Sequence, residues 1–265
     1  MAYQDGHLGG DDPNIVKFYE SRRAESCCHY LLPHLKPSYS ILDVGCGPGG
    51  ITSDLAGLVP HGKVLGIDLS PEIVAQAAMK YQAPNLSFEA GDAEILDEKF
   101  PEASFDVVHA HMSLLHFKDP VKALKAWYRI CKPGGIIACR NGKNFDIISL
   151  KPDLPVIRKT WPLNEDWMKW RGSDPEAGLH KEEWAREAGW LDEQRGGKLV
   201  MSESRQVHPI PMGAITGPFL DVLIKEGRTS AEEMVRLDQA WKEWEATEGH
   251  EFVTLASEML YFKTK

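Results

Sequence analysis

The chain has 265 residues, a length typical of one domain, and its 43% hydrophobic and 26% charged residues exclude disordered and fibrous proteins. Thirty Lys and Arg against 39 Asp and Glu give a net charge of −9, which argues against a nucleic-acid partner. No apolar run approaches the ~18 residues of a membrane span, and the first residues lack a signal-peptide pattern, so we expect a cytoplasmic protein with no membrane partner. The five cysteines are odd in number and have no metal-type spacing, which favours reduced thiols.

The first half of the chain alternates between strand and helix patterns. Residues 13–36 predict a leading helix or two. Ser70, Pro71 and Glu72 supply a capping residue, a proline and an acid in the first turn, which together predict a helix start. Five strands are expected, over residues 40–45, 63–70, 86–93, 105–112 and 136–140, with intervening helices that include 51–58 and 119–135. Strands that alternate with helices predict a parallel α/β sheet covered on both faces.

The second half is less regular. The segment 141–180 is rich in proline, glycine and tryptophan and is interpreted as an insertion. A helix over 180–190, a strand over 197–207, one or two helices over 213–247 and a last strand over 252–262 follow. We therefore expect a single domain, residues 1–265, with a sheet of seven mostly parallel strands. Its predicted parts are an N-terminal helical lid (1–39), a core (40–140) and two insertions (141–180 and 208–250) that form a helical cap.

A glycine-rich turn between the first strand and its helix carries the strongest motif. Its spacing, Gly45-x-Gly47-x-x-Gly50, lets a ligand lie against bare backbone at a helix N-terminus. Asp68, at the end of the next strand, suits ribose hydroxyls. The glycines alone leave open a nicotinamide dinucleotide or another adenosine cofactor. Asp43 would repel a pyrophosphate, which favours a ligand without phosphates.

Successive segments of the chain resemble the class I S-adenosylmethionine-dependent methyltransferases, in family order. They read ILDVGCGPGG, VLGIDLS, EAGDAEILDEKFPEASFDVV, SLLHFKDP and CKPGG. The resemblance is to the small-molecule branch related to ubiquinone and menaquinone C-methyltransferases, and it covers residues 10–140. The opening QDGHLGG, RRAE and YLLPHLKP further resemble fungal thiol S-methyltransferases of gliotoxin-type metabolism.

The resemblance implies a Rossmann-like fold, S-adenosylmethionine as cofactor, and a role for each matching residue. The glycines would line the cofactor, Asp43 would hold its methionine end, and Asp68 would bind the ribose hydroxyls. The remaining expected contacts are Leu69 on the adenine, Asp92 and Ala93 at the adenine edge, and Ala110 and His111 beside the methionine. Tyr19, Arg22 and Arg23 on the leading helix would cover the carboxylate, or else that helix is an ordinary amphipathic helix that packs its Tyr. The expected glycines are Gly45, Gly47 and Gly49. Taken singly, Asp68 and Asp92 are equally explained as helix-start and turn residues.

Three histidines cluster around the end of the fourth strand, at the edge where open α/β sheets bind ligands. His111 and His116 are candidate general bases, whereas His109 is expected to be a hydrogen-bonded core histidine. Two histidines on one strand face without a firm third ligand fall short of a metal site, so no metal is expected. Arg140, at the end of the fifth strand, is expected to hold an anionic substrate group, or else to be a solvated surface charge.

Seven of the eight tryptophans follow residue 160. Trp161 and Trp167 fall in the first insertion and predict a pocket for an apolar or aromatic substrate. Trp241 and Trp244, at helical spacing, are expected to be core residues. The predicted function is methyl transfer to a small metabolite, with a thiol as one candidate. The alternatives are an NAD(P)-dependent oxidoreductase and a cofactor-binding regulatory protein without turnover.

Overall fold

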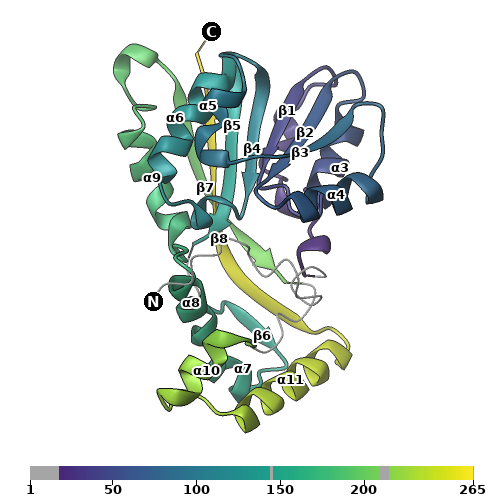
Figure 1. The fold of residues 1–265 in the computed structure, drawn as a ribbon, viewed down its shortest axis with the longest axis vertical. Helices are drawn as coiled ribbons and strands as arrows, with labels where there is room; N and C mark the ends of the chain where they lie inside the picture. Colours follow the sequence, from purple (N-terminus) through teal and green to yellow (C-terminus); the bar gives the residue numbers. More distant parts are fainter. Residues whose placement is uncertain (1–17, 144–145, 209–214, 265) are drawn as a thin grey trace.

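The computed structural model describes residues 18–143, 146–208 and 215–264 (Figure 1). Part of the predicted leading helix, residues 13–17, and the QDGHLGG segment therefore lie outside the described residues. One mixed sheet organises the rest of the chain. Its strands are β1 (Ser40–Val44), β2 (Lys63–Asp68), β3 (Leu86–Ala90), β4 (Phe105–His111), β5 (Cys131–Gly142), β6 (Ser149–Lys151), β7 (Lys198–Val207) and β8 (Glu251–Phe262).

Most helices begin where the sequence offers a cap or a proline. The Ile73 amide donates to Ser70 Oγ at 3.3 Å, which confirms the predicted start of α4. The α-helices are α2 (Ala24–Cys27), α3 (Gly50–Leu58), α4 (Pro71–Lys80), α5 (Leu96–Lys99), α6 (Pro120–Ile130), α7 (Pro155–Thr160), α8 (Pro162–Trp170), α9 (Ala177–Glu187), α10 (Pro218–Lys225) and α11 (Ala231–Ala246). Short 3-10 turns are η1 (Leu32–His34), η2 (Ala93–Ile95), η3 (Leu114–His116) and η4 (Glu193–Arg195).

The strand order is β3-β2-β1-β4-β5-β8-β6, with β7 paired to the other side of β8. Strands β1 to β5 run parallel, whereas β8 runs antiparallel to β5, β6 and β7. This confirms the predicted α/β class and adds one strand, β6, that the prolines around it concealed. The helix expected over 119–135 ends earlier, at Ile130. Pro133 disfavours helical geometry in the residue before it, and Gly134 has a φ of +76°.

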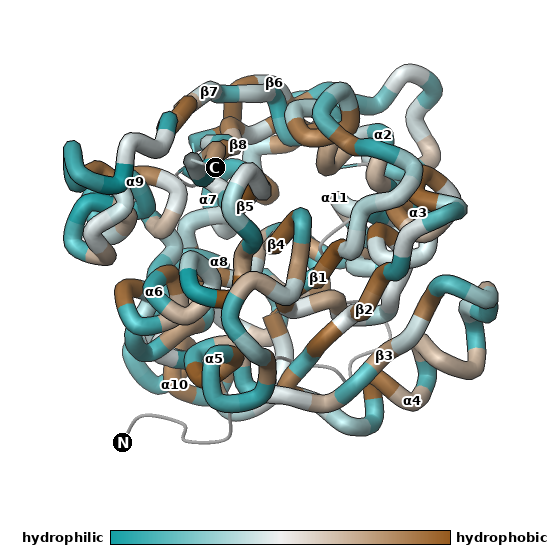
Figure 2. The backbone as a smooth tube through the Cα atoms, turned by 90° about the horizontal axis from the view of Figure 1, so that it is seen from above, coloured by the Kyte–Doolittle hydropathy of each residue, from teal (hydrophilic) through white to brown (hydrophobic). Residues whose placement is uncertain are grey.

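Two hydrophobic clusters cover the two faces of the sheet. One face packs α6 and α9 through side chains that include the fully buried Trp127 and Trp190. The other packs α2 and α3 through Cys28, Ile51 and Leu55. Viewed from above, the hydrophobic segments of β1, β2 and β4 run through the middle of the molecule (Figure 2). The cysteines are all free and buried, as expected.

A second lobe lies below the sheet, at the far end of the long strand β8 (Figure 1). It contains β6, α7, α8, α10 and α11, and it corresponds to most of the two predicted insertions. This lobe has a hydrophobic cluster of its own, in which Trp241 and Trp244 pack at a ring-centroid distance of 5.5 Å. Both are buried, which confirms them as core residues. No helix among the described residues is long and apolar enough to span a bilayer.

Candidate functional site

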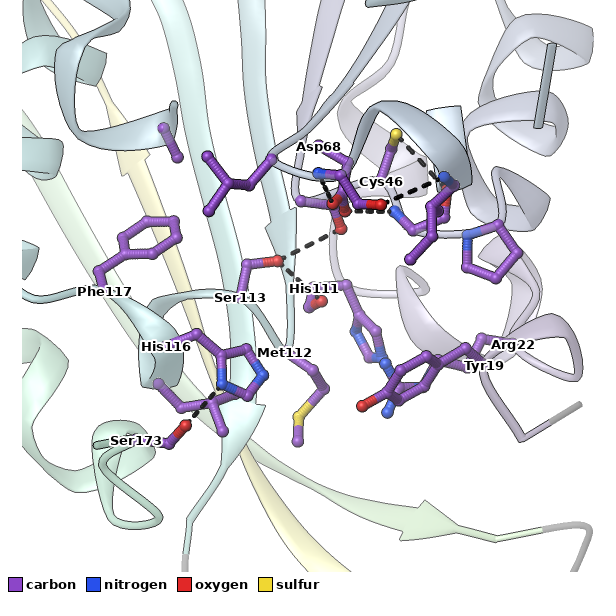
Figure 3. A pocket seen from close by; sticks show the side chains of 18 of the residues that line it. Tyr19, Arg22, Cys46, Asp68, His111, Met112, Ser113, His116, Phe117 and Ser173 are labelled. Carbon is purple, nitrogen blue, oxygen red and sulfur yellow. Dashed lines mark hydrogen bonds between the residues drawn. The ribbon is translucent and has the colours of Figure 1, made fainter. Parts of the chain in front are cut away.

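A cavity of about 1040 Å³ lies at the carboxyl ends of β1, β2 and β4, where the sheet meets the second lobe. The glycine turn and the loops after β2 and β3 border one part of the cavity, and β7, β8 and α8 border another. The segment Phe18–Arg22 borders both parts, since Arg22 lies next to Gly50 and Phe18 stacks on His208 (Figure 3). It is large enough to hold two small molecules side by side. The predicted residues that line it are Tyr19, Arg22, Asp43, Gly45, Gly47, Asp68, Leu69, Asp92, Ala93, His111, His116, Trp161 and Trp167.

The glycine turn presents bare backbone to this cavity. Gly45, Gly47 and Gly49 all have positive φ, at +69°, +51° and +85°, which explains why glycine occupies them. A side chain at Gly47 would meet nothing within 4 Å, so the cavity reaches the backbone there. Gly49 does not line the cavity, which corrects the prediction for it. A side chain at Gly49 would instead clash with the Phe88 ring, so this glycine permits close packing.

Asp68 holds the turn in place from the end of β2. Its carboxylate accepts hydrogen bonds from the Gly47 amide at 2.9 Å and from the Ser70 amide at 3.1 Å. Burial raises the pKa of this carboxyl above its usual value. In the loop after β3, Asp92 accepts from the Glu94 amide at 2.9 Å and caps η2. Both acids therefore have local structural roles, and both also border the cavity.

Asp43 and His109 form a buried pair beneath the turn. Asp43 accepts from Thr52 Oγ1 at 2.6 Å and lies 2.7 Å from His109 Nδ1. The other ring nitrogen of His109 lies 3.3 Å from Cys28 Sγ. Burial alone would lower the pKa of His109, but Cys28 and the Asp43 carboxylate outweigh burial and hold that pKa well above its usual value. His109 is thus the hydrogen-bonded core histidine expected from the sequence.

His111 and His116 both reach the cavity, and both are uncharged at neutral pH. His111 is 6% exposed at the end of β4, and its Nδ1 has no hydrogen-bond partner among the described residues. Burial, with the charge of Arg22 second, holds its pKa well below the usual value. His116 Nδ1 lies 2.8 Å from Ser173 Oγ, and burial lowers the pKa of His116 to about 3. Neither imidazole is a strong base.

The lid covers the cavity with two of its three predicted residues. The Arg22 guanidinium lies 4.6 Å from the Tyr19 ring centroid and 5.2 Å from that of Phe18, and Figure 3 shows Arg22 and Tyr19 beside His111. Arg23 does not line the cavity, contrary to expectation. Its guanidinium is paired with the Asp54 carboxylate on α3, because Arg23 precedes α2 and that helix packs against α3.

Two further predicted site residues, Arg140 and Ala110, do not line the cavity, each for a reason of its own. Arg140 was expected at the ligand-binding edge, but it is 2% exposed, lies 3.4 Å from the Glu258 carboxylate on β8 and contacts Ser204 on β7. The antiparallel strands β8 and β7 cover it, and the sequence alone does not show which strand lies next to β5. Ala110 does not line the cavity either. It packs into the hydrophobic cluster on the face of the sheet that α6 and α9 cover.

Several cavity residues were missed from the sequence. Gln206 and His208 belong to β7 and the residue just after it, and Thr254 belongs to β8. The polar residues at alternate positions 206 and 208 were an available signal, but nothing in the sequence shows that β7 and β8 pair along their length. Ser113 also lines the cavity, and its hydroxyl donates to the Val44 carbonyl at 3.0 Å.

Comparison with known proteins identifies the family. Residues 42–139 match the methyltransferase domain family. The chain is 33% identical to an uncharacterized methyltransferase of Schizosaccharomyces pombe over 203 residues, which cover 71% of this chain and 69% of that protein. The chain belongs to the class I S-adenosylmethionine-dependent methyltransferases. It is also 37% identical to the demethylmenaquinone methyltransferase of Chlorobaculum parvum, over 46% of this chain and 45% of that protein.

The fold of the methyltransferase agrees with this family. Its structure superimposes with a TM-score of 0.54 and 20% identity on phosphoethanolamine N-methyltransferase 2 of Haemonchus contortus, over 87% of this chain and 50% of that chain. The methyltransferase thus spans about half the length of the Chlorobaculum parvum enzyme and about half the length of the Haemonchus contortus structure. Family membership also decides the alternative that the glycine spacing left open, in favour of S-adenosylmethionine and against a nicotinamide dinucleotide.

The cavity of the methyltransferase fits the family's cofactor chemically. The cavity is bordered by five acidic side chains, Asp43, Asp68, Glu72, Asp92 and Glu94, which suit a ligand with a positive sulfonium and no phosphate. The open backbone at Gly47 leaves room for a ligand at the amino end of α3.

Proposed function

We propose that the methyltransferase transfers the methyl group of S-adenosylmethionine to a small apolar or aromatic metabolite. The observation that carries this proposal is the continuity of the cavity. A single space joins the glycine turn and Asp68 to a second end lined by Phe18, Trp161 and Trp167. Aromatic side chains of this kind favour the binding of flat, apolar molecules.

In this proposal the glycine-turn end binds the cofactor, which supplies a methyl group already activated on a sulfonium. The backbone at Gly45 and Gly47 borders its methionine portion, with Asp43 beneath. Tyr19 and Arg22 cover its carboxylate from the lid. The remaining contacts follow the family resemblance: Asp68 accepts from the ribose hydroxyls, Leu69 packs on the adenine, and Asp92 and Ala93 meet the adenine edge.

The chain's own contribution to the reaction is alignment and exclusion of water. The described part of the lid and the second lobe border the cavity on two sides, which limits the access of water to the acceptor. His111 and His116 are neutral and weakly basic. Each can therefore accept a hydrogen bond from the methyl acceptor at a ring nitrogen, but neither removes a proton well from a weakly acidic acceptor. An acidic acceptor suits this site, and a thiol of secondary metabolism, as in the fungal enzymes that the chain resembles, is such an acceptor.

Cofactor titration and turnover together test the proposal. We expect S-adenosylhomocysteine to bind the purified chain in calorimetry and NADH not to bind. Incubation with methyl-labelled S-adenosylmethionine and a panel of aromatic thiols, phenols and aliphatic acids should label the aromatic compounds preferentially. Binding without any transfer across the panel would favour the regulatory alternative, and transfer to the aliphatic acids alone would contradict the proposed acceptor class.

A further inference from the structure

The cavity has a polar wall within its aromatic surroundings. This wall consists of Gln206, His208 and Thr254, together with His111 from the end of β4. Gln206 and Thr254 are register partners on the antiparallel pair β7 and β8. Gln206 and His208 are two residues apart and face the cavity together, whereas Val207 between them is 61% exposed.

Two atoms of this wall are buried without a hydrogen-bond partner among the described residues. They are Gln206 Oε1 and His111 Nδ1, on side chains that are 8% and 6% exposed. Buried polar atoms in folded proteins almost always have a hydrogen-bond partner. Two such atoms without a partner, on side chains that line one cavity, therefore indicate a partner that binds from outside the chain. The side chains that carry these atoms, Gln206 and His111, line the same cavity, which also reaches the glycine turn.

The other polar side chains of the wall do not supply that partner. His208 Nε2 lies 3.0 Å from Thr254 Oγ1, so these two groups pair with each other. The His208 ring is fixed between aromatic neighbours: it stacks on Phe18 at a centroid distance of 5.8 Å and lies 4.8 Å from the Phe252 ring. Burial lowers the pKa of His208 to about 3, so this pair adds no charge to the wall at neutral pH.

We propose that Gln206 and His111 bind a hydroxyl group of the methyl acceptor and thereby select aromatic acceptors that carry one. A hydroxyl donates one hydrogen bond and accepts others, so it can donate to Gln206 Oε1 while it accepts from His111 Nδ1–H, in the tautomer that carries the ring proton on Nδ1. The ring of such a molecule would lie against Phe18 and Trp161, which border the same end of the cavity. This inference rests on the proposed function, because it assigns the acceptor end of that cavity.

Matched aromatic probes test the inference without knowledge of the natural acceptor. The protein, saturated with S-adenosylhomocysteine, is titrated with 1-naphthol and 1-methylnaphthalene, and with 2-naphthol and 2-methylnaphthalene, by ligand-observed NMR. Each pair exchanges only a hydroxyl for a methyl group. We expect the naphthol of at least one pair to bind about tenfold more tightly than its methyl analogue, the effect of a hydrogen bond to a buried group.

Three variants separate this role from a structural one. Gln206→Leu and His111→Phe should each reduce the naphthol preference to less than about threefold and leave the affinity for methylnaphthalene unchanged. Val207→Thr, on the opposite face of the same strand, should keep the wild-type preference. A preference that survives both Gln206→Leu and His111→Phe would overturn the inference, as would equal affinities within both pairs or the failure of both naphthols to bind.

The affinity for S-adenosylhomocysteine distinguishes this outcome from failure of the proposed function. If the cofactor product binds wild type, Gln206→Leu and Val207→Thr equally, the glycine-turn end is intact, and a naphthol preference that Gln206→Leu alone reduces reports on the polar wall. If S-adenosylhomocysteine does not bind wild type, the proposed function itself fails, whatever the probes do.

Discussion

Asp43 and His109 lie 2.7 Å apart beneath the glycine turn, and neither side chain reaches solvent. Because burial of an isolated carboxylate is costly, this carboxylate is stable there only with its partners His109 and Thr52. The pair therefore stabilises the folded protein beneath the glycine turn, and it is also part of the site.

His109→Gln should destabilise the protein by about 3 kcal/mol at pH 6, the usual cost of leaving one member of a buried pair without its partner. The folded-state pKa of His109 is well above its usual value, so its contribution is complete below pH ~6.5 and is lost as the pH rises through the folded-state value. Urea unfolding should show that the difference in the free energy of unfolding between wild type and variant is smaller at higher pH than at pH 6. His61→Gln, at an exposed position, should show a difference below about 0.5 kcal/mol throughout. If the loss of stability in His109→Gln is the same at every pH, His109 is not a charged partner of Asp43.

Asp68→Ala should weaken S-adenosylhomocysteine binding by about 1.5–3 kcal/mol, because hydrogen bonds to a charged group are lost. Asp68→Asn keeps one oxygen that can accept from the Gly47 amide, so its loss should be smaller. Calorimetry measures both dissociation constants, with Glu98→Ala on the exposed surface of α5 as the control. An unchanged affinity in Asp68→Ala would remove Asp68 from the cofactor contacts.

Lys181 is fully buried on α9, and its ammonium donates to the backbone carbonyls of Cys139, at 3.2 Å, and Ser257. Burial lowers its pKa from 10.5 to about 8, so the unfolded chain binds the proton more tightly than the folded protein does. The free energy of unfolding should therefore rise, relative to Lys181→Met, by about 3 kcal/mol between pH 8 and 10.5.

Denaturant titrations at pH 7.5 and 10.5 test the Lys181 prediction. The buried Cys131 lowers the stability of wild type and variant alike over the same range, because burial raises its pKa to about 12, and its effect cancels in the comparison. Lys125→Met, at an exposed position on α6, should show no such pH-dependent difference from wild type. If the difference for Lys181→Met is also flat, the folded-state pKa of Lys181 is not lowered.

Trp167→Ala should weaken binding of the naphthol probes and leave the affinity for S-adenosylhomocysteine unchanged. Trp167 lines the cavity and is only partly buried, so its removal leaves a small defect in the second lobe. Trp161→Ala should also lower stability, by about 3–5 kcal/mol, because Trp161 packs edge-on against Phe252 at 4.7 Å. Calorimetry and thermal unfolding separate the two effects, and an equal loss of stability in both variants would contradict this distinction.

The sequence predicts the cofactor end of the cavity well because its signals are local. The glycine spacing fixes positive φ at Gly47, and Asp68 lies close to that turn because parallel strands end at the same edge. Arg140 shows the limit of such reasoning. Its surroundings depend on β8, whose residue Glu258 comes 118 positions later (258 − 140), and no local pattern indicates that pairing.

The acceptor end is less predictable for the same reason. Gln206 and Thr254 become neighbours only because β7 and β8 pair over their length, across two intervening helices. Whether Arg23 or Arg22 turns toward the cavity depends on how α2 packs against α3, which the helix pattern does not specify. Gly49 was predicted from motif membership, but its neighbour Phe88 comes from β3.

Strand β8 joins the two halves of the molecule without a break. Its 12 residues pair with β6 in the second lobe at one end and with β5 in the sheet at the other. A hydrogen-bonded strand is much stiffer than a loop, so the lobe cannot swing on it as it would on a flexible hinge. In the proposed function, the distance between donor and acceptor would therefore depend mainly on sheet geometry, and a redesign of acceptor choice could exchange α7, α8, α10 and α11 while it keeps β8 unchanged.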